Sequence, residues 1–228
     1  MSNEMPPRTV FSQFALIGKA IGNGHRLELI DLLAQGERSV EELAGILRLS
    51  VANTSQHLQH LRRVGLVVGR KEGQRVYCSL ADKAVIELLD SLRHIAESNM
   101  AEVQKIAEEH FTSRDSLEEL SREELLTRIR NGQAMVIDVR PAVEFAAGHV
   151  AGAINFPMDN FEENLNKVPE DIEIVAYCRG PYCTLAYDAV ELLRGKGYAA
   201  RRLEDGFPQW KNAGFPSEAV LSPSQSGL

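Results

Sequence analysis

The first 65 residues carry apolar side chains at every third or fourth position in four separate runs, a spacing typical of amphipathic helices. Ser39 with Glu42 three residues later is a capping-box pattern that starts the third run. Gly36 and Gly65 are stop signals after the second and fourth runs. The last two runs, SVEELAGILRL and SVANTSQHLQHLRRVG, follow one another directly, and only "RLS" at their junction is left to form a turn. This arrangement predicts a helix-turn-helix.

Two β-like runs follow in LVVGRKEGQRVYCSL, joined by RKEG. Arg70, Lys71 and Arg75 gather at the tip of this predicted hairpin, where Glu72 alone opposes them. A basic hairpin after a recognition helix is typical of a winged helix, whose wing binds phosphates. Residues 48–75 hold six basic residues and one acidic residue, so we expect binding to nucleic acid that weakens as salt rises.

The pattern changes after a long helix-like run over residues 81–111. Small and charged residues follow, and then SREELLTRIRNG starts a new helix with a second capping box, Ser121 and Glu124. From there helix-like runs alternate with strand-like runs, which are AMVIDV, AGAINFP, IEIVAY and AARRLE. The alternation predicts a mostly parallel sheet covered by helices on both faces, with reactive groups at the carboxyl ends of its strands.

These patterns predict a multidomain chain. We expect an α+β domain over residues 1–111, a linker over 112–120, an α/β domain over 121–220 and a disordered tail over 221–228. Residues 1–80 hold 10 Lys and Arg against 7 Asp and Glu, a net charge of +3, whereas residues 81–228 hold 15 against 25, a net charge of −10. The overall charge of −7 therefore does not reveal that residues 1–80 are positively charged, as expected of a part that binds nucleic acid.

The composition of the chain indicates in which cellular compartment the protein works. The chain is 44% hydrophobic and 25% charged, as in ordinary globular proteins. No apolar run approaches the length of a membrane span, and the start MSNEMPPRTVFSQF lacks the basic and apolar regions of a signal peptide. We therefore expect a cytoplasmic protein, in which three cysteines do not indicate a disulfide framework.

The fourth run presents short or amide-bearing side chains beside a narrow apolar stripe of Leu58, Leu61 and Val64. Such groups on a recognition helix hydrogen-bond base edges. A solvated helix face is the alternative, and the basic hairpin favours DNA binding over it. The residues predicted to contact DNA are Ser50, Asn53, Thr54, Ser55, Gln56, His57, Gln59, His60, Arg62, Arg70, Lys71 and Arg75.

Two of the three cysteines, Cys178 and Cys183, bound the loop CRGPYC between a predicted strand and a predicted helix. Backbone N–H groups and the positive end of the helix dipole favour a thiolate at Cys178, and Arg179 adds positive charge beside it. The loop is short enough to curl its amides around an anionic sulfur adduct. These features indicate nucleophilic sulfur chemistry. Half a zinc site, a structural disulfide and simple packing fit the residues and the compartment less well.

The motifs HRLELIDLL, SVEEL, SQHLQHLRRVGLV and EGQRVYCSL resemble the arsenic-repressor (ArsR/SmtB) family of winged-helix regulators, over roughly residues 10–110. The resemblance implies a homodimer with the first and last helices at its interface, and repression at a two-fold-symmetric operator in double-stranded DNA. The cysteines of the family's metal and dithiol sensors are missing, so we predict no metal site and interpret Cys78 as a small buried hydrophobe. We interpret the remaining candidate ligands as surface residues: Asp90, His94, Glu109 and His110.

Residues 121–216 resemble a rhodanese (sulfurtransferase) domain through VIDVRPAVEFAAGHVAGAINFP, IVAYCRGPYC and LEDGFPQWKNAGFP. The resemblance implies a persulfide on Cys178, formed from a donor such as thiosulfate or a polysulfide and passed to a thiol acceptor, without a cofactor. Sulfide is a further expected small sulfur partner. The loop that would hold substrate or anion contains Arg179, Gly180, Pro181, Tyr182 and Thr184. A supporting polar network would contain Asp138, Arg140, Glu144 and His149.

The loop departs from the common family version at two positions. Pro181 has no N–H to donate, which puts efficient use of thiosulfate in question. Cys183 supplies a second thiol that could resolve a persulfide on Cys178. Three functions remain open: a repressor that senses or transfers reactive sulfur, a sulfurtransferase or thiol-based oxyanion reductase with an appended DNA-binding domain, and a DNA-binding protein whose rhodanese domain is a non-catalytic interaction platform.

Overall fold

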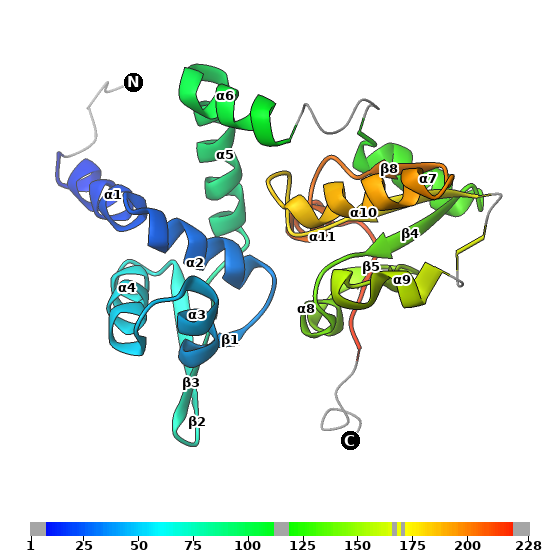
Figure 1. Ribbon diagram of the computed structural model, residues 1–228. Helices are drawn as coiled ribbons and strands as arrows, with labels where there is room; N and C mark the ends of the chain where they lie inside the picture. Colours follow the sequence, from blue (N-terminus) through cyan, green and yellow to red (C-terminus); the bar gives the residue numbers. More distant parts are fainter. Residues whose placement is uncertain (1–7, 112–118, 166–167, 170–171, 221–228) are drawn as a thin grey trace. The chain divides into compact units, whose positions relative to one another are not determined.

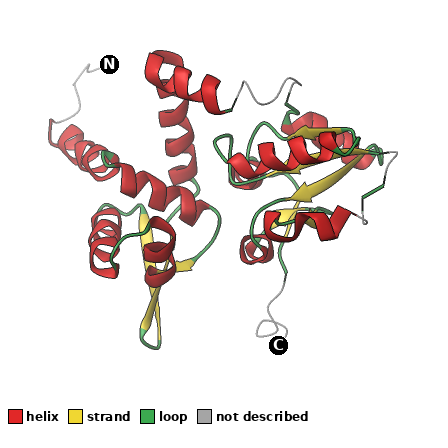
Figure 2. Cartoon of the chain, in the orientation of Figure 1, coloured by secondary structure: helices red, strands yellow, loops and turns green. Residues whose placement is uncertain are grey.

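The computed structural model describes residues 8–111, 119–165, 168–169 and 172–220 (Figure 1). The chain forms two compact units, Met1–Ser91 and Leu92–Leu228, which divide earlier than the predicted linker. Apart from Glu119 and Leu120, that linker lies outside the described residues, as does the predicted tail at 221–228. Figure 2 shows helices around a narrow hairpin in the first unit, and strands between helices in the second.

Helices α1 to α4, the first residues of α5 (Ala84–Asn99) and a small antiparallel sheet build the described part of the first unit. The strand order is β1-β3-β2, and the prediction of a winged helix-turn-helix is confirmed. The hairpin turns at Gly73 and Gln74 rather than across RKEG, because Gly73 adopts a φ of +60° that suits glycine. The elements are α1 (Arg8–Ile21), α2 (Gly24–Ala34), β1 (Arg38–Ser39), α3 (Val40–Leu47), α4 (Val51–Arg63), β2 (Val67–Glu72) and β3 (Arg75–Leu80).

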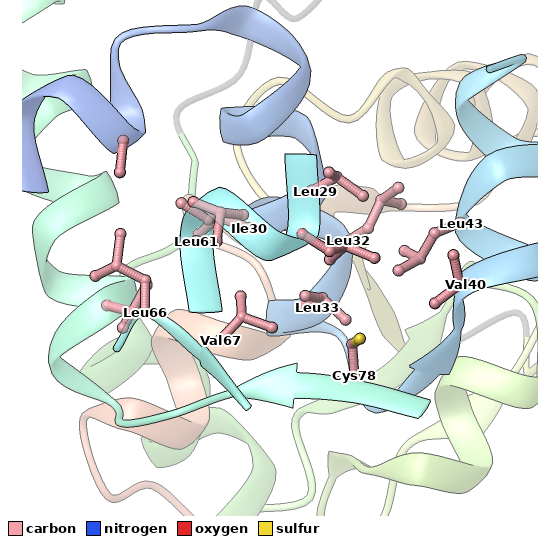
Figure 3. Packing of buried hydrophobic residues seen from close by; sticks show 13 residues of the cluster. Leu29, Ile30, Leu32, Leu33, Val40, Leu43, Leu61, Leu66, Val67 and Cys78 are labelled. Atoms are coloured by element: carbon pink, nitrogen blue, oxygen red, sulfur yellow. The ribbon is translucent and has the colours of Figure 1, made fainter. Parts of the chain in front are cut away.

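The core of the first unit joins its helices to the hairpin (Figure 3). Leu29 and Leu33 of α2 pack with Leu43 of α3, Leu61 of α4 and the thiol of Cys78 on β3. Burying one leucine side chain stabilises a fold by about 1.5–3 kcal/mol. Cys78 is 1% exposed, and burial raises the pKa of its thiol. Its prediction as a small buried hydrophobe is confirmed.

The turn of the helix-turn-helix is built from local signals. The Ser39 hydroxyl accepts a hydrogen bond from the Glu42 N–H (3.2 Å), and the Glu42 carboxylate accepts one from the Ser39 N–H (2.7 Å). This capping box starts α3 and lowers the pKa of Glu42, chiefly through the hydrogen bond from the Ser39 backbone. Arg48 ends α3 in the left-handed region at a φ of 54°, which turns the chain toward α4.

The long helix-like run over 81–111 is divided in two, which sequence reasoning did not predict. Helix α5 (Ala84–Asn99) and helix α6 (Ala101–His110) are separated by Met100, which has an extended backbone (φ −111°, ψ 106°). The Asn99 side chain donates to the Ile95 carbonyl at 2.8 Å. Such local bonds let asparagine compete with the helical backbone, which explains the break at this point.

A four-stranded parallel sheet with the order β6-β4-β7-β8 is the centre of the second unit. Short strands β5 and β9 pair antiparallel beside it, and sequence reasoning missed both because two residues carry no readable alternation. The elements are α7 (Arg122–Arg130), β4 (Ala134–Asp138), α8 (Ala142–Ala147), β5 (His149–Val150), β6 (Ile154–Asn155), η2 (Met158–Asn160), α9 (Phe161–Asn164), β7 (Glu173–Tyr177), α10 (Thr184–Gly195), β8 (Ala200–Arg202), α11 (Phe207–Asn212) and β9 (Ser217–Glu218).

Strand β7 shows why both faces of this sheet are apolar. Its side chains alternate between faces, as they do in any strand. Ile174 and Ala176 pack in one buried cluster with residues of α9 and α10, whereas Val175 and Tyr177 pack in another with residues of α7 and α11, including Trp210. The prediction of a mostly parallel sheet covered by helices on both faces is confirmed.

Candidate functional site

The cysteine loop, residues 178–183, connects the carboxyl end of β7 to the first turn of α10. Cys178 follows Tyr177 directly and is 2% exposed, and Cys183 is the half-buried N-cap residue of α10. The Cys183 N–H donates to the Gly180 carbonyl at 3.0 Å, which closes the loop as a tight turn. Cys178 thus lies where unpaired backbone N–H groups at the start of a helix favour a thiolate.

The two cysteines of this loop are joined in a disulfide, with Cα atoms 6.2 Å apart. That separation lies within the usual range of disulfides. Sequence analysis disfavoured a structural disulfide here and expected Cys183 to be able to resolve a persulfide on Cys178, and the structure joins these two thiols across one tight turn. A pair formed across one short loop suits a reversible redox bond, since it closes a ring of only a few residues and constrains the unfolded chain little.

The segment after β8 packs against the backbone of the cysteine loop. Gly206 lies so close to the Arg179 carbonyl and the Gly180 amide that a Cβ atom at position 206 would overlap both. The Phe207 N–H donates to the Cys178 carbonyl at 3.1 Å. Sequence reasoning did not assign these residues to the site, although the glycine at the end of a strand-like run was an available signal.

Arg179 does not offer an uncompensated charge beside Cys178, which differs from the prediction. Its guanidinium donates to both carboxylate oxygens of Glu144, with Nη2–Oε1 at 2.7 Å and Nε–Oε2 at 3.0 Å. Glu144 comes from α8 and its side chain is only 2% exposed. Because the carboxylate is buried and the contact uses two guanidinium nitrogens, this ion pair is geometrically specific.

Asp138 and Arg140 form a buried network with Tyr177. Arg140 donates to Asp138 (Nη2–Oδ2, 2.6 Å) and to the Gly148 carbonyl at 2.7 Å. The Tyr177 hydroxyl donates to Asp138 at 2.5 Å and accepts from the Val150 N–H at 3.0 Å. Burial and the Asp138 charge raise the pKa of Tyr177. The network connects the ends of β4 and β7 to β5, directly before the cysteine loop.

The other two residues of the predicted network have separate partners. Glu144 binds Arg179, as described, and His149 stacks on Phe145 with ring centroids 3.7 Å apart. His149 Nδ1 lies 2.8 Å from the Phe145 carbonyl. Of the remaining loop residues, Tyr182 and Thr184 are exposed, while Gly180 and Pro181 are half-buried.

The recognition helix α4 exposes most of the side chains predicted to contact DNA. Asn53, Gln56, Gln59, His60 and Arg62 are exposed, and Ser55 and His57 are half-buried. Burial lowers the pKa of His57, with smaller contributions from the charges of Arg26, His25 and His60.

Two residues of the predicted DNA surface have structural positions instead. Thr54 is fully buried, because it shares the apolar stripe of Leu58 and Leu61, and its hydroxyl donates to the Ser50 carbonyl at 3.1 Å. Thr54 is therefore removed from the DNA-contacting set. The Ser50 hydroxyl accepts from the Asn53 N–H at 3.2 Å and so caps α4.

The wing differs from the expected cluster of unopposed basic residues. Arg70 donates to Glu37 (Nη2–Oε2, 2.7 Å) and to Glu72 (Nη1–Oε2, 2.5 Å), and it lies over the Tyr77 ring at 5.2 Å. These partners raise the pKa of Arg70, the Glu37 hydrogen bond most strongly. Lys71 and Arg75 are exposed on either side of the turn.

Among the described residues, no helix is long and apolar enough to cross a membrane, and no group of three or more His, Cys, Asp and Glu side chains is placed to hold a metal ion. Two open hollows of about 510 and 540 Å³ are lined by surface residues of α7 and of α9 and α10 with their flanks, and neither lining includes a residue of the cysteine loop.

Fold and site together define a DNA-binding winged helix-turn-helix joined to a rhodanese-like α/β domain with its own cysteine loop. The family model described as "Bacterial regulatory protein, arsR family" matches residues 23–68, and the model "Rhodanese-like domain" matches residues 121–213. The chain is 41% identical over 207 residues to "HTH-type transcriptional regulator Rv0324" of Mycobacterium tuberculosis, covering 91% of both chains. The chain therefore belongs to the ArsR family of bacterial transcriptional regulators, in a form that carries a C-terminal rhodanese-like domain.

Two further similarities each cover one part of the chain. The chain is 28% identical over 100 residues to a "Sulfurtransferase" of Allochromatium vinosum, which corresponds to 43% of this chain and 92% of that protein. A solution structure described as the homodimeric winged helix-turn-helix DNA-binding domain of a possible ArsR-family regulator from Mycobacterium bovis is 36% identical. It covers 45% of this chain and 95% of its own, with a TM-score of 0.41.

Proposed function

We propose that this regulator is a homodimeric repressor in which the rhodanese-like domain takes up reactive sulfur at Cys178 and thereby changes the affinity of the protein for its operator. The observation that carries the proposal is the Cys178–Cys183 pair, at the carboxyl end of a central strand, in a chain of a DNA-binding family. Neither cysteine is needed for the fold of the winged helix-turn-helix, whose own Cys78 is buried in its core.

The DNA contacts in this proposal come from α4 and the wing. The exposed amide and basic side chains of α4 reach base edges in the major groove, and Lys71 and Arg75 of the wing bind phosphates. Exposed apolar side chains on α1, such as Phe11 and Phe14, supply the dimer surface, because large apolar groups of this kind are usually covered in the assembled protein. A two-fold operator follows from a two-fold dimer.

The sulfur chemistry proceeds in two displacements at the loop. The Cys178 thiolate attacks the terminal sulfane sulfur of a donor R–S–SH, the S–S bond of the donor breaks, and RSH leaves once it is protonated. The Cys183 thiolate then attacks Cys178 Sγ in the resulting persulfide, the persulfide S–S bond breaks, and hydrosulfide leaves. The sulfane sulfur is reduced to sulfide, the two thiols are oxidised to the disulfide, and a dithiol reductant restores them.

A second function is kept because of the similarity to the Allochromatium vinosum protein named "Sulfurtransferase". In that case an external thiol accepts the sulfur from Cys178 before Cys183 reacts, and the domain turns over many times. Two other functions for the rhodanese-like domain stay open beside sulfur sensing and sulfur transfer. They are a thiol-based oxyanion reductase and a non-catalytic interaction platform. Sustained turnover with an excess of thiol acceptor, lost in Cys178→Ser, distinguishes the enzyme from a sensor that reacts once.

The test uses a DNA duplex selected from a random library by the reduced full-length protein. Its Kd is measured by fluorescence anisotropy before and after treatment with sodium tetrasulfide. We expect affinity at least about fivefold lower after treatment, within the usual range of coupling between two sites. Cys178→Ser should abolish the change, whereas the matched control Cys78→Ala should keep it. A wild-type protein that forms the disulfide and binds DNA unchanged would refute the sensing proposal.

A further inference from the structure

We infer that the cysteine loop selects sulfane donors without an oxyanion head, namely hydropersulfides and polysulfides, and discriminates against thiosulfate. The inference rests on the proposed uptake of sulfur at Cys178 and adds the class of donor. Thiosulfate presents three oxygens with two negative charges, and its attack by Cys178 must expel sulfite. A site that accepts it needs hydrogen-bond donors and positive charge aimed at those oxygens.

The only cationic side chain of the loop is committed elsewhere. Both oxygens of Glu144 accept from Arg179, and the buried carboxylate would be left uncompensated if Arg179 turned toward a substrate. Breaking a buried ion pair in this way is strongly unfavourable. Arg179 therefore contributes little net positive charge at the sulfur, and its Nε and Nη2 groups are bound to Glu144 rather than aimed at the oxygens of thiosulfate.

Two positions of the loop also offer no backbone donor. Pro181 has no N–H, and the N–H of Cys183 is used by the Gly180 carbonyl. Gly206 packs directly against the Arg179–Gly180 peptide group, which holds this part of the loop in place. The thiolate keeps the helix end of α10 for stabilisation, while an oxyanion head lacks the donors at positions 181 and 183 and the full charge of Arg179. A hydropersulfide or polysulfide has no oxyanion head, so the missing donors do not slow its reaction with Cys178.

The experiment is carried out in Cys183→Ser protein, where a persulfide on Cys178 accumulates and is counted by intact-mass spectrometry. Initial rates are measured with sodium tetrasulfide, from which trisulfide leaves, and with sodium thiosulfate, from which sulfite leaves. Two further variants in this background restore anion donors independently. Glu144→Gln releases Arg179, and Pro181→Ala supplies an N–H.

We expect the parent to react with tetrasulfide and only slowly with thiosulfate. Each added variant should shift the ratio of the two rates toward thiosulfate by at least about tenfold, because single preorganised oxyanion donors change such rates by roughly 10²–10³. Pro181→Ala keeps the test decisive if the buried Glu144→Gln change prevents folding.

Three results would overturn the inference, and they separate it from the function on which it rests. Two of these results would refute the proposed selection of donors and leave the proposed uptake of sulfur at Cys178 standing. They are thiosulfate reacting as fast as tetrasulfide in the parent, and a rate ratio that neither variant changes. A Cys178 that forms no persulfide with either donor removes the proposed function as well.

Discussion

The wing and the cysteine loop both carry an arginine that was expected to face an anion, and in both the guanidinium binds carboxylates. The difference lies in burial. In the wing, Arg70, Glu37 and Glu72 have side chains that are 54%, 38% and 63% exposed. In the loop, Arg179 is 29% exposed but its partner Glu144 is 2% exposed. An exposed ion pair is weak and a DNA phosphate can displace it, whereas a pair with one buried end is held. Arginine can therefore be released to bind a ligand in the wing, whereas in the cysteine loop it is held in a structural ion pair.

The largest effect should come from removing one member of the fully buried pair Asp138–Arg140. In Asp138→Asn, Arg140 loses its carboxylate partner while still 0% exposed, so the free energy of unfolding of the second unit should fall by about 3–5 kcal/mol. Urea unfolding followed by the fluorescence of Trp210, the one tryptophan of the chain, reports on this unit. The control Glu162→Gln removes one member of the exposed pair Lys196–Glu162 in the same unit and should leave the transition almost unmoved. A loss below about 1 kcal/mol in Asp138→Asn would show that burial does not set the strength of these pairs.

A smaller effect is expected when the support behind the cysteine loop is altered. Gly206→Ala places a methyl group against the Arg179 carbonyl and should displace the loop, at a cost of about 1–3 kcal/mol. We expect the rate of persulfide formation on Cys178 to fall by roughly tenfold, the factor that 1.4 kcal/mol represents. Mass spectrometry with tetrasulfide measures the rate. Gly195→Ala on α10 meets no atom within 4 Å and is the matched control; equal rates in both variants would contradict the role of Gly206.

A smaller effect, on DNA affinity, is expected when the carboxylate partners of Arg70 in the wing are removed. In the double variant Glu37→Gln, Glu72→Gln, Arg70 loses both carboxylates and becomes available to a phosphate. Binding to the selected duplex should strengthen, and the slope of log K against log salt should steepen by up to about 0.9, the value of one phosphate contact. Glu102→Gln with Glu108→Gln on α6 makes the same change in net charge in a helix that is not part of the wing. If that control steepens the slope as much, Arg70 is not the cause.

The smallest effect concerns His57 and pH. Since burial lowers its pKa in the folded state, the folded protein binds fewer protons than the unfolded chain just below pH 6.5. The free energy of unfolding of the first unit should therefore rise with pH through this window and level off above the unfolded pKa. His57→Gln should flatten that rise in urea titrations followed by far-UV circular dichroism, whereas His94→Gln should retain it. An unchanged profile in His57→Gln would show that the shift does not contribute to stability.

Much of the fold could be predicted from the sequence because its signals are local. The capping box of Ser39 and Glu42, the apolar stripe through Leu58 and Leu61, and the alternation of strands with helices each lie within a few adjacent residues. The same stripe also contained the information that Thr54 is buried, since it lies four positions before Leu58. The break at Met100 depends on the competing hydrogen bond of one side chain, and hydrophobic periodicity does not report it.

The site was predicted only in part, for a physical reason. Cys178 could be placed at a strand end and Cys183 at a helix start from their neighbours alone. The partners that decide the electrostatics are distant in sequence: Glu144 lies 35 residues before Arg179, and Glu37 lies 33 before Arg70. Gly206 likewise meets Arg179 only in the folded sheet. Which charge is neutralised, and what fixes the loop, are therefore properties of the tertiary structure.

The most direct test of the central claim is a single tetrasulfide titration in which DNA release and the Cys178–Cys183 disulfide are measured in the same samples. Anisotropy of the selected duplex gives the bound fraction, and mass spectrometry after alkylation gives the disulfide fraction. We predict that the two curves share one midpoint in the wild type, and that neither signal changes in Cys178→Ser. Release of DNA from Cys178→Ser at the same tetrasulfide concentration, or complete disulfide formation in the wild type with DNA still bound, would contradict the account.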